Sequence, residues 1–171
     1  MTRALFRTEV LPSTPAITTR LGVVSANWTE KEIGKFVKQS AESAYSLCAA
    51  GDSIEGYVVA VEAAMAQGFS VGSVQQRDVK RVTCDGLQAT PGTGVIAVGD
   101  FVVCGTVVAK DTALTAPARV VKATSQIGSV PADLTAAGAM ARAAMFAWRV
   151  VSLGTGAGAV GTVAVIERVS A

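Results

Sequence analysis

From residue 51 onward, short runs of valine, isoleucine and threonine alternate with glycine, aspartate and proline. Short β-branched runs bounded by such turn formers are typical of β-strands. The pattern predicts strands at residues 54–62, 78–84, 101–108, 119–122, 147–151 and 161–168. Several short strands at this spacing favour a closed or two-layered all-β architecture. The expected fold class is therefore mainly β, a small β-barrel or sandwich.

One short helix is expected ahead of these strands. Thr29 and Glu32 have the spacing of a capping box, in which each side chain satisfies a free backbone amide of the first turn. Trp28 before the cap and Ile33 after it fit a hydrophobic staple. These signals predict a helix over about residues 29–40.

Residues 1–28 are expected to form an extended N-terminal arm, followed by a single β-rich domain over residues 29–171. Pro12 and Pro15 each lack a backbone N–H donor, which opposes a continuous strand ladder. Apolar side chains lie along the arm without a helical or strand period, so the arm needs a surface to lie on. That surface is either its own domain or a neighbouring molecule. The candidate contact residues are Arg3, Leu5, Phe6, Arg7, Val10, Leu11 and Ile17.

The composition adds two constraints on partners. Hydrophobic residues make up 50% of the chain and charged residues 16%, with a mean hydropathy of +0.44. Such a surplus of small apolar residues fits either a core of small side chains or a second buried surface, such as an oligomer interface. The formal net charge of +2 gives no global signal for nucleic acid or an anionic membrane. Arg142 and Arg149 interrupt the most apolar region, so no membrane span is expected.

The residue types exclude most catalytic schemes. The chain contains no histidine, which rules out Ser-His-Asp and Cys-His nucleophiles and histidine-bearing zinc sites. Nothing in the spacing brings Glu55 and Glu62, or Asp52 and Asp100, together as a carboxylate pair, and we interpret such residues as turn formers. The chain is therefore expected to be no enzyme and to need no cofactor or metal. Free thiols are expected at Cys48, Cys84 and Cys104.

Gly156, Gly158 and Gly161 match the G-x-G-x-x-G dinucleotide motif. That motif works between a strand and a helix whose N-terminus faces the pyrophosphate, with an acidic residue about 20 positions further on. Here only ten residues follow Gly161, and they have the composition of a strand. We therefore interpret the motif as a glycine-rich turn that enters the last strand.

Three stretches of the chain share one sequence pattern, in which glycine lies next to an apolar run that reads as a strand. Residues 50–61 and 95–105 each contain a Gly-Asp pair near an apolar strand, and residues 157–166 end in Gly-x-x-Gly-x-Val-x-Val. With the Ala/Thr-rich middle, these stretches make the chain over about residues 51–171 resemble bacteriophage capsid decoration proteins, also called cement or head-stabilising proteins. The N-terminal arm also resembles the extended arms with which such proteins grip the shell.

The resemblance implies a structural virion protein that binds the outer surface of a phage capsid and stabilises contacts between capsomers. It implies the major capsid protein as partner, through the arm residues named above, and a homo-oligomer, as a trimer or a dimer. The protein would be made in the bacterial host cytoplasm and end on the capsid surface, with no nucleic-acid or membrane partner. Two alternatives stay open: another β-rich head–tail or tail component of a phage, and a small β-barrel enzyme with a carboxylate site.

Overall fold

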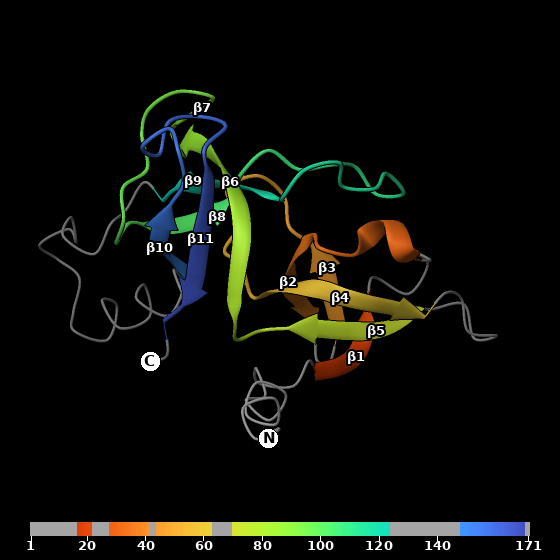
Figure 1. Ribbon diagram of the computed structural model, residues 1–171. Helices are drawn as coiled ribbons and strands as arrows, with labels where there is room; N and C mark the ends of the chain where they lie inside the picture. The colour runs from red at the N-terminus through yellow and green to blue at the C-terminus, as the bar shows by residue number, and fades with distance from the viewer. Residues whose placement is uncertain (1–16, 22–27, 42–43, 63–69, 124–147, 170–171) are drawn as a thin grey trace, which may run out of the picture.

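The computed structural model describes residues 17–21, 28–41, 44–62, 70–123 and 148–169. The chain is mainly β, as predicted, and within these ranges the only helical element is a single 3-10 turn, η1 (Glu30–Glu32). Figure 1 shows two groups of strands side by side, joined by the chain between β5 and β6. In the described ranges, no helix combines the length and the apolar composition needed to cross a membrane.

The first group of strands is a closed barrel, here called barrel 1. Its strands are β1 (Ile17–Leu21), β2 (Phe36–Ala41), β3 (Ala44–Leu47), β4 (Gly56–Glu62) and β5 (Ser70–Gln75). They follow the order β1-β3-β2-β4-β5, and the pairing of β5 with β1 closes the ring. The β1–β3 pair is parallel, and the other neighbouring pairs are antiparallel.

The second group is a six-stranded sheet of order β11-β10-β8-β9-β6-β7. It consists of β6 (Val79–Leu87), β7 (Thr90–Pro91), β8 (Phe101–Cys104), β9 (Arg119–Lys122), β10 (Trp148–Leu153) and β11 (Val163–Arg168). Because β11 also pairs with β6, five of these strands form a closed ring, here called barrel 2, and β7 lies outside it. The β6–β9 pair is parallel and the other pairs are antiparallel.

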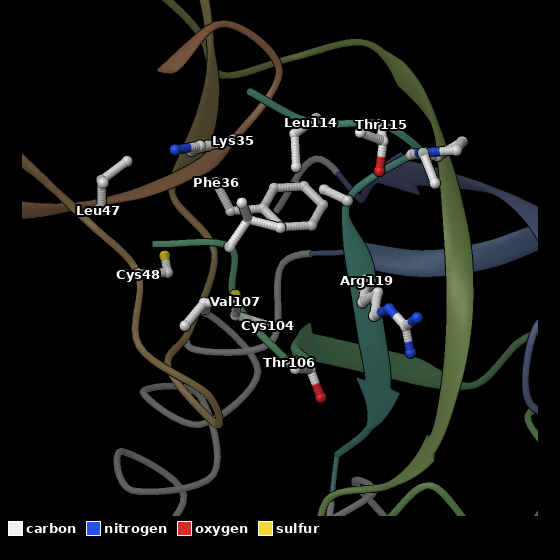
Figure 2. Close-up of a pocket in the computed structure, with 14 residues that line it drawn as sticks. Lys35, Phe36, Leu47, Cys48, Cys104, Thr106, Val107, Leu114, Thr115 and Arg119 are labelled. Atoms are coloured by element: carbon white, nitrogen blue, oxygen red, sulfur yellow. The ribbon is translucent and has the colours of Figure 1, made fainter. Parts of the chain in front are cut away.

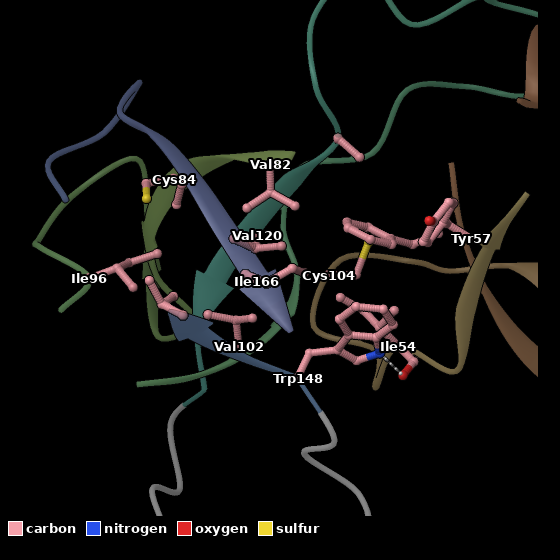
Figure 3. Packing of buried hydrophobic residues seen from close by; sticks show 14 of the residues in the cluster. Ile54, Tyr57, Val82, Cys84, Ile96, Val102, Cys104, Val120, Trp148 and Ile166 are labelled. Atoms are coloured by element: carbon pink, nitrogen blue, oxygen red, sulfur yellow. Dashed lines mark hydrogen bonds between the residues drawn. The ribbon is translucent and has the colours of Figure 1, made fainter. Parts of the chain in front are cut away.

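The hydrophobic cluster that fills barrel 2 extends to side chains of barrel 1. Trp148 of β10 is fully buried, and its ring lies 6.4 Å from that of Tyr57 in β4, centroid to centroid. The Trp148 Nε1–H donates a hydrogen bond to the carbonyl oxygen of Ile54 at 3.1 Å, drawn as a dashed line in Figure 3. Val102 and Val120 of barrel 2 belong to the same cluster. The two barrels are therefore packed as one body.

The helix predicted over residues 29–40 is wrong. The capping box itself is present, with the Thr29 N–H donating to Glu32 Oε2 at 2.8 Å. The turn ends after η1, and Gly34 adopts a φ of +87°. Phe36 and Val37 are then buried in two different clusters, because successive side chains of a strand point to opposite faces. The pairing of β2 with β3 and β4 fixes this segment as a strand.

All six predicted strands correspond to strands in the structure. The bounds of β9 are those predicted, and the other five strands differ from their predictions at one or both ends. The largest difference is at the strand predicted over residues 101–108. There β8 ends at Cys104, because the chain leaves the sheet at Gly105. β1 falls within the predicted arm, and its five residues pair in register with β5, from Ile17 opposite Val74 to Leu21 opposite Ser70. This part of the arm is built into barrel 1, whereas residues 1–16 and 22–27 lie outside the described residues.

Candidate functional site

The β8–β9 connection, residues 105–118, makes a polar contact with barrel 1. It leaves barrel 2 and extends toward barrel 1 in Figure 1. The Lys35 ammonium donates to the carbonyl oxygen of Ala109 at 2.8 Å, and the Asp111 N–H donates to Glu32 Oε1 at 2.7 Å. Lys35 Nζ lies 3.4 Å from the same carboxylate oxygen. A buried ion pair between Glu32 of η1 and Lys35, the residue before β2, thus holds this connection.

Glu32 is ionised in this setting. Burial by itself raises the pKa of its carboxyl group, but hydrogen bonds from Thr29 and the Asp111 backbone, together with Lys35, bring that pKa below its usual value. A buried carboxylate that accepts this many hydrogen bonds is a structural anchor, since its lone pairs are occupied by the protein itself.

A second carboxylate anchors the other end of the connection. Asp85 of β6 is buried and accepts hydrogen bonds from the Thr106 N–H at 2.9 Å and from the Thr106 hydroxyl. Arg119 of β9 donates to it at 2.8 Å. Burial raises the pKa of Asp85, and the hydrogen bonds from Thr106 and Arg119 more than reverse this effect, so its pKa lies below the usual value.

A pocket of about 150 Å³ lies between the barrels, beside this connection. Figure 2 shows Cys48 of barrel 1 and Cys104 of barrel 2 on its wall, with Phe36 and Leu114 nearby. Its wall is mainly apolar. The lining residues are Lys35, Phe36, Leu47, Cys48, Cys104, Thr106, Val107, Val108, Leu114, Thr115, Ala116, Pro117, Ala118 and Arg119.

The pocket does not have the chemistry of a thiol active site. A hydrogen bond with Cys104, together with burial, raises the pKa of the Cys48 thiol far above its usual range. The nucleophile in thiol chemistry is the thiolate, so a thiol held in the protonated form is inert. The sequence contains no histidine to act as a base. Among the residues that the structure describes, no group of three or more acidic or cysteine side chains is placed to hold a metal ion.

Three of the four acidic residues considered above, Asp52, Asp100 and Glu55, take part in separate ion pairs. Lys38 Nζ lies 2.6 Å from Asp52, and Lys122 Nζ lies 2.9 Å from Asp100. Both aspartates also accept a backbone N–H three residues earlier in the chain, at 2.7 Å for Asp52 and 2.8 Å for Asp100. These contacts agree with their interpretation as turn formers. Glu55 pairs with Arg168 at 3.7 Å.

The G-x-G-x-x-G match is a turn between β10 and β11, as predicted. Gly156, Gly158 and Gly161 have φ values of +118°, +82° and +89°, and a strand follows them. A Cβ added at Gly158 would collide with the carbonyl oxygen of Ile96, whose N–H donates to the Gly158 carbonyl at 3.0 Å. This turn therefore packs directly against the segment that precedes β8.

Gly158→Ala is expected to lower the free energy of unfolding by about 2–3 kcal/mol, because it combines a strained positive φ with the collision at Ile96. Gly161→Ala is the matched control, since its φ is similar but its Cβ would meet open space. We expect it to cost about 1–2 kcal/mol. Urea denaturation of both variants measures the difference, and equal losses would show that the Ile96 contact contributes nothing.

Seven large apolar side chains of the described ranges are exposed. One of them, Val79, lies in strand β6. The other six lie in connections between strands, and they are the candidate docking residues: Ile33, Val95, Val98, Val107, Val108 and Val160. Sequence reasoning missed this set, because the exposure of a valine in a β-rich chain depends on the tertiary fold. The nearby turn glycines were the available signal.

The contact residues predicted in the arm are only partly placed by the structure. Ile17 lies in β1, opposite Val74. The other six, Arg3, Leu5, Phe6, Arg7, Val10 and Leu11, are outside the described residues, so their role stays a prediction.

Of the basic residues near the start of β6, Lys80 lies over the Tyr57 ring, with Nζ 4.0 Å from the centroid.

No protein-family model, curated protein or solved structure matches this chain.

Proposed function

We propose that this chain is a structural virion protein that binds the outer surface of a phage capsid and stabilises contacts between capsomers. The observation that carries the proposal is the combination of two packed barrels with exposed aliphatic side chains on their connections. The described residues offer no nucleophile with a neighbouring base and no metal-binding cluster. Exposed apolar side chains at connections suit a protein that buries them against another protein.

The stretches that carry the resemblance support the proposal in their local structure. Gly51 and Asp52 form the turn ahead of β4, and Gly99 and Asp100 form the turn ahead of β8. The closing glycine stretch turns into β11. Each of the three stretches with this sequence pattern therefore forms the same structural unit, a turn followed by a strand.

Rigidity is the property that this function requires. A protein that holds neighbouring capsomers together must resist being pulled apart between its own halves. The shared core around Trp148 and the anchors at Glu32 and Asp85 connect the two barrels. A stable interface of this kind buries roughly 1,200–2,000 Å² in total, more than a single exposed side chain provides. The arm residues predicted above would supply part of that area.

Deleting residues 2–16 is expected to abolish binding to phage heads while leaving the melting temperature nearly unchanged. The deletion spares β1, which begins at Ile17 and completes barrel 1. It removes apolar side chains whose burial contributes on the order of 1.5–3 kcal/mol each. Co-sedimentation with heads that lack this protein measures binding, and thermal unfolding measures stability.

A deletion of residues 2–21 is the control for this experiment, since it also removes β1 and should unfold barrel 1. A 2–16 deletion that sediments with heads as the full chain does would refute the role of the arm. One that is unfolded would show that the arm belongs to the barrel.

A further inference from the structure

The two barrels have the same topology. Barrel 1 has the ring order β1-β3-β2-β4-β5 and barrel 2 the ring order β6-β9-β8-β10-β11. In both rings the first pair is parallel and the remaining four are antiparallel. Position by position, β1 corresponds to β6, β2 to β8, β3 to β9, β4 to β10 and β5 to β11.

The match extends to the register of the strand pairs. Arg20 pairs with Ala44 and Val71 in barrel 1, and its counterpart Thr83 pairs with Arg119 and Val163 in barrel 2. The bulge also recurs. In barrel 1 the β4–β5 pairing shifts between Val58 and Ala60, and in barrel 2 the β10–β11 pairing shifts between the corresponding residues Val150 and Ser152. A shift of one residue in any strand pair of either barrel would break this correspondence. We therefore treat the two barrels as two copies of one structural module.

The cores are built from corresponding positions. Val37, Tyr45, Val58 and Val74 fill barrel 1, and all four are buried. Their counterparts are Val102, Val120, Val150 and Ile166, which are buried in barrel 2. Because the strand register and the buried positions are the same in both modules, surface residues at corresponding positions also have the same neighbouring backbone.

The turn that enters the second strand of each module is the same. Gly34 has a φ of +87° and donates to the Val58 carbonyl at 2.8 Å, and Gly99 has a φ of +91° and donates to the Val150 carbonyl at 2.8 Å. The return hydrogen bonds also match, from the Val58 N–H to Lys35 at 3.0 Å and from the Val150 N–H to Asp100 at 2.9 Å.

Each of these turns exposes an aliphatic side chain just before the glycine. Ile33 is 41% exposed and Val98 is 60% exposed. The neighbouring corresponding positions have changed chemistry, since Glu30 corresponds to Val95 and Lys35 to Asp100. A single exposed valine needs no explanation. Gly34, Phe36 and Val37 also recur, as Gly99, Phe101 and Val102, and the turn geometry and the hydrophobic clusters account for these three. The exposed aliphatic side chain before the glycine has no such role inside its module, so its recurrence indicates a repeated contact.

We propose that Ile33 and Val98 are equivalent contact points, each inserted into the same apolar pocket on one of two neighbouring copies of the shell subunit. This inference rests on the proposed function. A shell built from identical subunits presents the same pocket on every subunit. A protein with two copies of one module can therefore occupy the pockets of two neighbouring subunits in the same way. In Figure 1, η1 lies at the right end of the molecule and the green segment that enters β8 lies at the left end. Contacts at opposite ends bridge two subunits, and binding is then bivalent.

The test measures the affinity of the purified full-length chain for phage heads that lack it, with Ile33→Asp, Val98→Asp and the double variant. Each single substitution is expected to lower the apparent affinity by roughly 10²-fold, because losing either contact removes the gain from bivalency. The exchange variant Ile33→Val with Val98→Ile should bind like the original chain, since equivalent pockets accept either side chain. Val79→Asp, at a residue 56% exposed and outside both turns, is the control and should bind normally.

Thermal unfolding of every variant should match the original chain, because the substituted side chains are exposed. If the original chain binds heads and either single substitution leaves its affinity unchanged, the repeated contact is wrong while the proposed function stands. If Val79→Asp weakens binding as much as Val98→Asp does, the effect is one of charge and the contact is again refuted. If the original chain itself does not bind heads, both proposals fail.

Discussion

Replacing Glu32 by alanine is expected to lower the free energy of unfolding by about 3–5 kcal/mol, the cost of removing one partner from a buried ion pair. The substitution leaves the Lys35 ammonium buried without its carboxylate and the Thr29 and Asp111 amides without an acceptor. It also releases the β8–β9 connection from barrel 1. Chemical denaturation measures the loss.

The matched control is Lys110→Ala, because Lys110 pairs with Asp111 at 2.8 Å in an exposed ion pair on the same connection. We expect it to change stability by less than about 0.5 kcal/mol, as is usual for exposed pairs. A Glu32→Ala variant that loses no more than the Lys110→Ala variant would show that the buried pair does not hold the connection.

Trp148→Ala is expected to lower the free energy of unfolding by about 3–5 kcal/mol, as for other fully buried large side chains. Trp148 contributes to the core that both barrels share, so the loss should be accompanied by separation of the barrels. We expect unfolding of this variant to lose its single cooperative transition, with fluorescence of Trp28 in barrel 1 and far-UV circular dichroism giving different midpoints.

Trp148→Phe separates packing from hydrogen bonding at the same site. It keeps an aromatic ring in the core but leaves the Ile54 carbonyl without its indole donor, at a cost of about 1–3 kcal/mol. If the Trp148→Ala variant unfolds in one transition and loses less free energy of unfolding than the Trp148→Phe variant does, the indole does not join the two barrels.

The strands with strong β-branched patterns could be predicted from the sequence, because local composition is enough when a run such as 163–166 alternates between buried and half-buried positions. β3 (Ala44–Leu47) and β5 (Ser70–Gln75) could not. Serine, glycine and glutamine dominate β5, and it is a strand because it pairs on both sides, with β1 and β4. That stabilisation comes from residues distant in the sequence.

The error at residues 29–40 has a similar cause. The local helix signals at Thr29 and Glu32 were real and produced the capping box, but one turn of 3-10 helix satisfied them. Gly34 then redirected the chain, and pairing with β3 and β4 outweighed the weak helical preference of the segment. A capping box specifies where a helix begins and carries no information about its length.

The duplication was hidden in the sequence for a physical reason. The modules share burial and register, which many apolar residues satisfy equally well, and their connections differ in length. One local trace is Gly-x-Phe-Val, at Gly34 to Val37 and again at Gly99 to Val102, and a second is the Val-Val pair at Val58 and again at Val150. The candidate docking residues were likewise beyond prediction, since the exposure of Ile33 and Val98 follows from the closed rings.

Cryo-electron microscopy of the phage head tests the central claim most directly. We predict density for two adjoining barrels per copy on the outer surface of the shell, lying across a boundary between neighbouring subunits, with the η1 turn on one subunit and the turn before β8 on the next. Heads that show no such density, or particles that carry this protein only on the tail or inside the shell, would contradict the proposed function.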